Sequence, residues 1–472
     1  MDCVEGQASS RLIAYASKVK VLLVRPPRRD VWDAGLSVPP LGLAYIASSI
    51  RESGHEVELV DAYSLGMDWF QLEEVLAESD AEVLGLGTMT PVAGTAYRVA
   101  RMAREHFSWI VLGGPHPTAV GAKVYEECSE VDHLVLGEGE EVIGPYLNWL
   151  EKECLGCPPS GVMAAQQDFV EHRPTRPVGS IPWPARELLP NHAYRYLMAT
   201  RPGFATMITS RGCPFQCSFC DKSVSGSRWR ARDAVDVVQE MQHLVQSGVG
   251  FINFYDDNFT LNRKRVEQIC QEILRVGLDV HWKCEGRVDG VDVELLKLMR
   301  RAGCRVIAYG VESGNRETLA LLRKDVEVEQ VVRAFSETRE AGLRSLAYLI
   351  LGAPGEDADD VRRSIRFARE IGADYVQFSA LTALPGTPLF AESSDRRRVS
   401  VRSPVDSEIE KDTLTDLPEE ELNRLMKQAW RSFYLRPTPM VRLAKDAVSS
   451  GSVFEGIRLL KSMARWSLSS TR

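Results

Sequence analysis

Short apolar segments alternate with helical patterns through residues 18–150, and this alternation constrains the fold more than any other feature of the chain. Strands that are separated by helix-length segments are joined by crossovers, so they are expected to pair in parallel. The region is therefore predicted to be an α/β domain with a doubly wound parallel sheet, which binds ligands at the carboxyl ends of its strands. The five predicted strands are VKVLLV, HEVELV, EVLGLG, WIVLGG and HLVLG.

Glycines gather at the predicted carboxyl ends of these strands, as Gly87–Thr88, Gly113–Gly114 with His116 close behind, and Gly137–Glu138. Glycine lets the backbone approach a ligand closely or adopt a positive φ, so the series fits a flat, bulky cofactor lying across the sheet edge. Turns from strand to helix also need glycine for their own geometry. The series by itself leaves both interpretations open.

A second alternation of strand and helix runs through residues 201–395 and predicts a partial (β/α)6 barrel; a full barrel would need eight such units. Its strands are predicted in ATMITS, GFINFYDDNFT, DVHWKCEGRV, RVIAYGVESG, RSLAYLILGAPGE and YVQFSALTALPG. Residues 151–200 are expected to be a linker. Residues 396–472 are expected to form a small C-terminal helical region, entered through a charged loop near 395–412.

Three cysteines follow the first strand of the second alternation directly, as Cys213, Cys217 and Cys220 in RGCPFQCSFCDK. Four thiolates saturate a [4Fe–4S] cluster, so three with no fourth at matching spacing leave one iron open for another ligand. A zinc site would need a further ligand, and the nearest downstream histidine, His243, lies in a predicted helix. Three closely spaced cysteines cannot all pair as disulfides. The cluster interpretation is preferred.

Other polar and glycine-rich segments end the later strands of the predicted barrel, where such folds carry their chemistry. Asp256 and Asp257 end the second strand, and paired carboxylates of this kind could bind a divalent metal or make polar contacts in a pocket. Arg287 ends the third strand and Glu312 lies just past the fourth. The turn at 352–356, LGAPGE, ends the fifth strand.

The cysteine spacing resembles the motif of the radical S-adenosylmethionine (SAM) superfamily. The ordered segments PPLGLAYIASSIRESGHEVELVDA, LGLGTMTP, VLGGPHPT and VLGEGE resemble the Rossmann-like, cobalamin-binding domain of its B12-dependent members. These include cobalamin-dependent methyltransferases and proteins similar to the anaerobic magnesium-protoporphyrin ester cyclase. The Asp-x-His-x-x-Gly box by which many cobalamin domains supply a histidine to cobalt is absent, which leaves His116 as a candidate lower-face ligand or neighbour.

This resemblance implies a set of cofactors and site residues. SAM would bind at the open iron and be cleaved to a 5′-deoxyadenosyl radical, with Asp257 making polar contacts in the active site. The residues implied to contact SAM are Phe219, Arg287, Glu312, Gly352 and Pro354. Those implied to contact cobalamin are Gly87, Thr88, Gly113, Gly114, His116, Gly137 and Glu138.

The preferred function is methylation of an unactivated carbon in a small-molecule biosynthetic precursor, with electrons from a donor such as flavodoxin or ferredoxin. The resemblance also leaves open a cobalamin-dependent oxidative cyclase or ring rearrangement without methyl transfer. A third alternative is a corrinoid-binding protein that has lost catalysis. The intact cysteine triad argues against the last.

Composition limits the partners and the location of the chain. Asp and Glu number 65 against 57 Lys and Arg, for a net charge of −8, so a nucleic-acid partner is not expected. No apolar run reaches the roughly 18 residues that span a bilayer. Ten cysteines without a recognisable signal peptide point to a reducing compartment, and the protein is expected to be soluble and cytoplasmic. Residues 453–472 mix basic and apolar side chains; membrane contact is possible there, but packing on the protein is expected.

Overall fold

A computed structural model describes residues 18–27, 37–165, 167–392, 397–401, 409–458 and 461. The chain divides into two compact units, Met1–Arg28 with Pro40–Pro190, and Arg29–Pro39 with Asn191–Arg472. Each unit is built on a six-stranded sheet.

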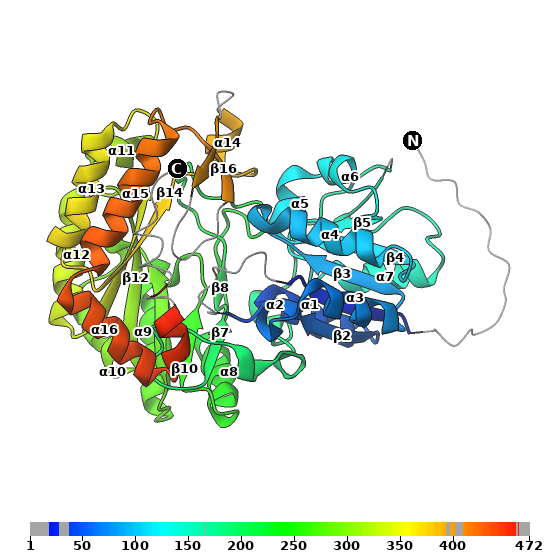
Figure 1. Cartoon of the computed structure of the whole chain (residues 1–472). Coiled ribbons are helices and arrows are strands. Elements are labelled where there is room, and N and C mark those ends of the chain that lie inside the picture. The colour runs from blue at the N-terminus through cyan, green and yellow to red at the C-terminus, as the bar shows by residue number, and fades with distance from the viewer. Residues whose placement is uncertain are drawn as a thin grey trace. The chain divides into compact units, whose positions relative to one another are not determined.

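The first unit contains a sheet of strand order β2-β1-β3-β4-β5-β6, in which the first five strands are parallel. Helices cover both of its faces (Figure 1). The predicted doubly wound α/β fold is confirmed. Its strands are β1 (Lys20–Arg25), β2 (Glu56–Asp61), β3 (Val83–Gly87), β4 (Trp109–Gly113), β5 (His133–Val135) and β6 (Val162–Ala164), and its helices are α1 (Leu41–Glu52), α2 (Ala62–Leu65), α3 (Trp69–Glu78), α4 (Ala93–Ala103), α5 (Pro115–Val120), α6 (Lys123–Glu127) and α7 (Ile143–Glu151).

The central strand β1 shows why this sheet has two cores. Successive side chains of a strand point to opposite faces. Leu22 and Val24 accordingly enter a cluster with residues of α3 and α4, whereas Val21 and Leu23 enter a second cluster with residues of α1 and α7. Both faces are therefore covered, as the near-continuous apolar runs of the sequence predict.

The antiparallel edge strand β6 was not expected, because its residues lie in the predicted linker. It pairs with β5 in the register His133↔Ala164 and Val135↔Val162. An added antiparallel strand at the edge of a parallel sheet is common in α/β folds, since it satisfies backbone groups that would otherwise face solvent.

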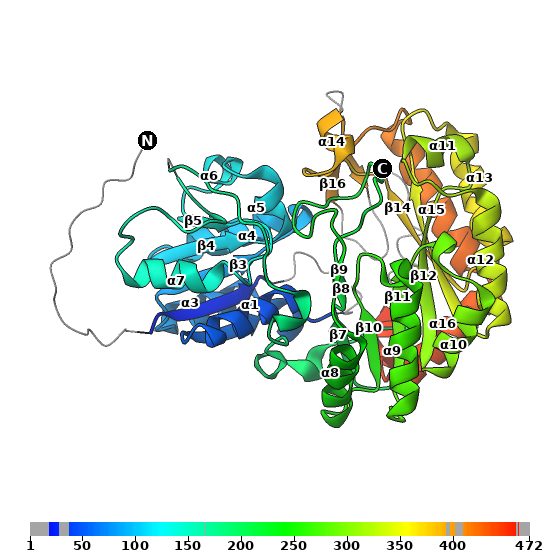
Figure 2. The ribbon, with the colours of Figure 1, turned by 180° about the vertical axis from the view of Figure 1, so that it is seen from behind.

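The second unit contains a wholly parallel sheet of order β14-β13-β12-β11-β10-β7, which confirms the predicted partial (β/α)6 barrel. Helices α8 to α13 lie along its outer side (Figure 2). The strands are β7 (Phe204–Met207), β10 (Phe251–Phe254), β11 (His281–Gly286), β12 (Cys304–Glu312), β13 (Arg344–Leu351) and β14 (Tyr375–Ala380), and the helices are α8 (Ala234–Gln246), α9 (Arg263–Arg275), α10 (Val293–Arg301), α11 (Arg316–Leu321), α12 (Val328–Glu340) and α13 (Ala358–Glu370).

Several of these helices begin at a side chain that satisfies the free amides of the first turn. Asn262 accepts a hydrogen bond from the amide of Arg265 at the start of α9, and Asp292 does the same for Leu295 at the start of α10. Asp357 caps α13 within a capping box. These caps end each preceding loop at a defined residue and so hold the loops at the carboxyl ends of the strands in place.

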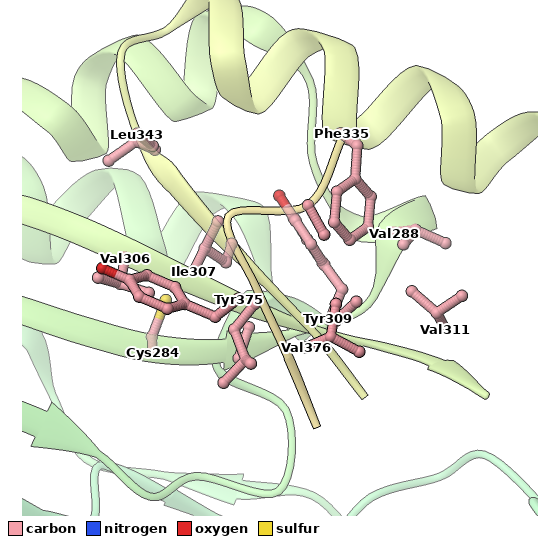
Figure 3. Close-up of a cluster of buried hydrophobic side chains, with 14 of the residues drawn as sticks. Cys284, Val288, Val306, Ile307, Tyr309, Val311, Phe335, Leu343, Tyr375 and Val376 are labelled. Carbon is pink, nitrogen blue, oxygen red and sulfur yellow. The ribbon is translucent and has the colours of Figure 1, made fainter. Parts of the chain in front are cut away.

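The core of the second unit lies between the sheet and its helices (Figure 3). Cys284 of β11 is fully buried in this core, opposite Ile307 of β12 in the sheet register. Tyr309 and Phe335 pack 5.3 Å apart between their ring centroids and join β12 to α12. Cys284 is therefore a packing residue rather than part of a ligand pocket.

The C-terminal part of the chain contains α14 (Pro388–Glu392), α15 (Glu419–Tyr434) and α16 (Pro437–Ser449). Strands β15 (Arg397–Val401) and β16 (Ile409–Thr413) form an antiparallel pair, so the expectation of a loop is wrong for these two stretches, whose backbone groups pair with each other. The prediction for residues 453–472 lies outside the described residues except at 453–458 and 461.

None of the helices among the described residues combines the length and the apolar composition needed to cross a membrane.

Candidate active site

The cysteine loop begins at a tightly constrained glycine. Gly212 has φ of +82°, and a Cβ at this position would overlap the backbone carbonyl oxygen of Arg228. Its amide donates a hydrogen bond of 2.8 Å to Oδ2 of Asp257, at the end of β10. The next amide, that of Cys213, donates to the carbonyl of Gly226 at 3.3 Å. The first cysteine is therefore positioned by the bond of the preceding amide to a carboxylate and by the bond of its own amide to a backbone carbonyl.

The middle of the loop is held through Ser218, which lies between the second and third cysteines. Its amide donates to the carbonyl of Leu322 at 3.0 Å, and its own carbonyl accepts from the amide of Leu389 at 2.8 Å. The amide of Cys220 donates to the carbonyl of Cys217 at 3.3 Å and closes a turn. The backbone between the cysteines is thus tied to two other segments of the second unit.

The thiols of the three cysteines interact electrostatically with one another. Burial raises the pKa of the Cys217 thiol and raises that of Cys220 to about 11, and the Cys213 sulfur raises both further. All three are free thiols. With raised pKa values, Cys217 and Cys220 stay protonated until a metal displaces the proton.

The donor set consists of three free cysteine thiols in one loop, the type of ligand that an iron–sulfur cluster uses. Among the described residues, no three His, Cys, Asp or Glu side chains gather so that they could hold one metal ion. A [4Fe–4S] cluster does not require its cysteine ligands to surround one ion, because each cysteine binds a separate iron atom. A preformed zinc site is therefore not found in the part of the chain that the structure describes.

A buried ion pair lies beside the cysteine loop. Nζ of Lys324 donates a hydrogen bond of 2.7 Å to Oε1 of Glu312, and the two side chains are only 8% and 7% exposed. Glu312 has φ of +64°, an uncommon conformation for a residue with a side chain. A Cβ on Gly310 would overlap the charged atoms of both partners, so this glycine leaves the space in which the pair lies. Lys324 also lowers the pKa of Cys217, which places its charge near the cysteine loop.

Arg287 forms a second buried charge centre nearby. Its guanidinium pairs with Asp289, at 2.9 Å from Nε to Oδ1 and 3.0 Å from a terminal nitrogen to Oδ2, and also donates to the carbonyls of Lys324 and Asp325. It stacks 3.6 Å over the ring centroid of Phe215 within the cysteine loop. Arg287 therefore joins β11, the cysteine loop and the turn after α11.

Phe219, the predicted SAM contact inside the triad, packs with a small apolar cluster and lies 5.9 Å from Nζ of Lys324, measured to its ring centroid. The structure therefore brings Phe219, Arg287 and Glu312 together around the cysteine loop.

The paired aspartates at the end of β10 have different environments. Asp256 is buried and accepts hydrogen bonds from the amide of Thr209 at 2.7 Å, from the hydroxyl of Thr209 at 2.6 Å and from the hydroxyl of Ser210. Asp257 is exposed and bonds to the amide of Gly212. Asp256 thus holds β10 to the segment that enters the cysteine loop, and among the described residues neither carboxylate belongs to a group of three or more side chains that could hold a metal ion.

The turn after β13 is organised by Glu356. Its buried carboxylate accepts from the amides of Gly352 at 3.0 Å and Ala353 at 2.9 Å, and from the hydroxyl of Thr318 at 2.9 Å. Burial raises the pKa of Glu356 although these donors oppose the shift. Gly352 has φ of +77°, and Pro354 follows in the same turn. The carboxylate of Glu356 therefore fixes the backbone of this turn.

The predicted cobalamin contacts of the first unit lie at the carboxyl ends of β3, β4 and β5. The amide of Thr88 donates to the carbonyl of Gly113 at 2.9 Å, and Gly114, with φ of +101°, leaves no room for a Cβ against the backbone of Thr88. Gly137 has φ of +77° with open space around it, and Glu138 is buried. Beside them, Met89 and Val92 are exposed apolar side chains, 58% and 39% accessible. This edge fits a broad, partly apolar cofactor.

His116 is engaged within the protein. Its Nε2 lies 2.8 Å from the hydroxyl of Tyr97, which donates to Glu127, so Nε2 carries the proton. Its Nδ1 lies 3.2 Å from the hydroxyl of Thr90. Burial lowers the pKa of His116, which favours this neutral form. Coordination of cobalt by His116 would require one of these hydrogen bonds to break.

Two residues of the site were missed by the sequence reasoning as individual contributors. Lys324 stands in a charged RKD segment that reads as a solvated turn, and its neighbours Arg323 and Asp325 both have positive φ. In the sequence, Glu356 is the last residue of a glycine-rich turn, and nothing there indicates that its carboxylate binds the backbone of that turn. The strained backbone at 323–325 is a signal of a functional position, but it exists only in the folded chain.

The second unit by itself defines a class of protein, one in which a parallel partial barrel presents three cysteines to a cluster with one open iron. Sequence comparison agrees. The family model of the Radical SAM superfamily matches residues 207–368, and that of the B12 binding domain matches residues 31–144. The chain belongs to the family of radical SAM enzymes that carry a B12-binding domain, and its cofactors are a [4Fe–4S] cluster, SAM and cobalamin.

Two curated relatives illustrate the family. The uncharacterized methyltransferase PH0819 of Pyrococcus horikoshii is 32% identical over 90% of this chain and 94% of its own length. The anaerobic magnesium-protoporphyrin IX monomethyl ester cyclase of Rubrivivax gelatinosus is 30% identical over 76% of this chain and 67% of its own.

Two solved structures share the fold. The radical SAM methyltransferase TsrM from Kitasatospora setae, with cobalamin and a [4Fe–4S] cluster bound, superposes with a TM-score of 0.73 at 18% identity, covering 95% of this chain and 99% of TsrM. The cobalamin-dependent SAM radical enzyme OxsB, with aqua-cobalamin and SAM bound, gives 0.72 at 16% identity, covering 94% and 72%. The resemblance shows the fold.

Proposed function

We propose that this chain is a cobalamin-dependent radical SAM methyltransferase that acts on a carbon atom of a small-molecule precursor. The observation that carries the proposal is the match to a relative named as a methyltransferase across nearly the full length of both chains. The cysteine loop and the glycine-rich edge of the first unit add the two cofactor sites that such a reaction needs. Electrons would come from a small donor protein such as flavodoxin or ferredoxin.

The site residues take the following proposed roles. Cys213, Cys217 and Cys220 hold the cluster, and Asp257 fixes the start of their loop. Bound SAM and the cluster supply a hydrogen-abstracting radical, and bound cobalamin supplies a methyl carrier. SAM carries both an ammonium and a carboxylate group, and the pairs Glu312–Lys324 and Arg287–Asp289 offer both charges to it. The proposed SAM contacts remain Phe219, Arg287, Glu312, Gly352 and Pro354.

The proposed cobalamin contacts occupy one edge of the first unit. Backbone groups at the strand ends would lie against the corrin, and exposed Met89 and Val92 would cover its apolar parts. His116, with both ring nitrogens engaged, would act as a neighbour of the cofactor. The full set is Gly87, Thr88, Gly113, Gly114, His116, Gly137 and Glu138.

We further infer that residues 18–150 act as the cobalamin-binding domain and residues 201–395 as the radical SAM core. Residues 151–200 would join them, and residues 396–472 would complete the C-terminal region. The two family-model matches, at 31–144 and 207–368, support these assignments. The nine cysteines of the described residues are free thiols, which supports a cytoplasmic location.

A second candidate is an oxidative cyclisation without methyl transfer. The 30% identity to a magnesium-protoporphyrin ester cyclase supports it. That relative covers less of this chain than the methyltransferase PH0819 does, so methyl transfer is the better supported function.

The experiment is an anaerobic incubation of the chain reconstituted with iron, sulfide and hydroxocobalamin, with SAM and a low-potential reductant. Mass spectrometry would follow 5′-deoxyadenosine and S-adenosylhomocysteine. Formation of both products, lost when Cys213, Cys217 and Cys220 are replaced by Ala, is the expected result. Deoxyadenosine without S-adenosylhomocysteine would favour the cyclase. The matched control is C270A, since Cys270 is buried in the core away from the loop.

A further inference from the structure

Cationic side chains lie around the cysteine loop, and two of them, Lys324 and Arg287, are neutralised by carboxylates. Lys324 is paired with Glu312 at 2.7 Å. Arg287 is paired with Asp289 at 2.9 Å. Another cation, Lys222, stands two residues after Cys220.

Lys222 differs because its ammonium is buried and has no hydrogen-bond partner among the residues that the structure describes. The nearest carboxylate in sequence, Asp221, is occupied, since it accepts from the amide of Ser223 at 2.8 Å and from its hydroxyl at 3.0 Å. An unpaired ammonium away from water is costly, so a fold retains one only where an anionic group completes its surroundings.

The backbone turn that carries Lys222 is hydrogen-bonded to the cysteine loop. The amide of Gly226 donates to the carbonyl of Lys222 at 2.9 Å and closes a turn. The carbonyl of Gly226 in turn accepts from the amide of Cys213. The turn that carries Lys222 thus begins two residues after Cys220 and is hydrogen-bonded to Cys213. Its charge also lowers the pKa of the Cys220 thiol, against the effect of burial.

We propose that the ammonium of Lys222 is an electrostatic partner of the iron–sulfur cluster and raises its reduction potential. This inference rests on the cofactor assignment above. A cluster that accepts an electron becomes more negative, so a nearby unpaired positive charge stabilises the reduced form. Charge and hydrogen bonds to the sulfurs are general determinants of cluster potential. Lys222 is therefore a positioning residue for electron entry, distinct from the cysteine ligands.

The test compares wild type, K222M, K222R and K264M as full chains reconstituted with iron and sulfide, without SAM. Met preserves the length of the side chain and removes the charge, and Arg keeps the charge. Lys264 is an exposed lysine on α9 and serves as the control. The reduced cluster is followed by electron paramagnetic resonance during a redox titration, with iron content measured for each sample.

K222M is expected to lower the ratio of reduced to oxidised cluster at a fixed potential by about tenfold or more, which corresponds to about 59 mV for one electron. K222R and K264M should stay within about threefold of wild type. If K222M does not retain its cluster, K222Q is titrated under the same criterion.

An unchanged potential in a charge-removed variant with full iron content would overturn the inference. A shift in K222R as large as that in K222M would also overturn it, because charge would then not be the cause. The titration is then repeated with SAM, and a K222M shift that appears only in this second titration would assign Lys222 to SAM and refute a direct effect on the cluster. Wild-type chain that assembles no cluster at all would refute the cofactor assignment itself.

Discussion

Removing the ammonium of Lys324 should destabilise the second unit far more than removing an exposed lysine. In K324M the carboxylate of Glu312 would remain buried, 7% exposed, without its 2.7 Å partner. Breaking a buried pair by deleting one partner costs about 3–5 kcal/mol, because an uncompensated charge stays in the interior.

The matched control is Lys297, which forms a 2.9 Å pair with Glu340 on the surface, with side chains 47% and 61% exposed. K297M should cost about 1 kcal/mol or less. The double variant E312Q/K324M removes both charges and should recover much of the loss. Hydrogen-exchange mass spectrometry on peptides of β12 in the anaerobic apo protein measures the local free energy of opening.

The reasoning would be refuted if K324M lost no more stability than K297M, or if E312Q/K324M were less stable than K324M alone. Either result would mean that the carboxylate of Glu312 is hydrated in solution and that the Lys324 pair contributes no more than a surface contact.

The remaining predictions concern the cysteine loop, the proposed cobalamin-binding edge of the first unit, and the pH dependence of stability. G212A should abolish cluster assembly, measured as iron per chain, because its Cβ would overlap the carbonyl of Arg228 at a φ of +82°; retention of full iron would contradict this. G114A should weaken cobalamin retention on gel filtration, since its Cβ would lie 2.9 Å from the carbonyl oxygen of Thr88; unchanged retention would contradict the assigned edge. Burial lowers the pKa of His281 to about 4, so the unfolded chain binds more protons between pH 6.5 and 4 and this residue's contribution to stability is lost as the pH falls through that range. The difference in melting temperature between wild type and H281Q should therefore shrink from pH 7 to pH 5, and a constant difference would refute the linkage.

The sequence was sufficient for the fold class and for the location of the cluster loop, because both depend on local patterns. Strand and helix periods, and three cysteines directly after a strand, are visible in one dimension. The edge strand β6 was not visible, since three residues of ordinary composition become a strand only by pairing with β5.

The charges around the site could not be assigned from sequence. Lys324 and Glu312 are 12 residues apart, and their contact depends on the strained turn at 323–325 and on the absence of a side chain at Gly310. The engagement of His116 by Tyr97 and Thr90 likewise depends on how α4 and α5 pack. Partners in tertiary contact decide these roles, and a residue's type alone does not.

The distribution of sulfur in the second unit has a consequence for damage and repair. Cys270, Cys284 and Cys304 are fully buried in the wall of the barrel, whereas Cys213 and Cys220 lie partly open in the loop. Oxidants therefore reach the loop sulfurs first, where sulfenic acids and disulfides can be reduced again by thiols. The wall keeps its packing meanwhile. Exposure to air should thus oxidise the cluster and the loop cysteines before the cysteines of the barrel wall. Reducing these thiols and rebuilding the cluster should then restore an inactivated chain without unfolding it.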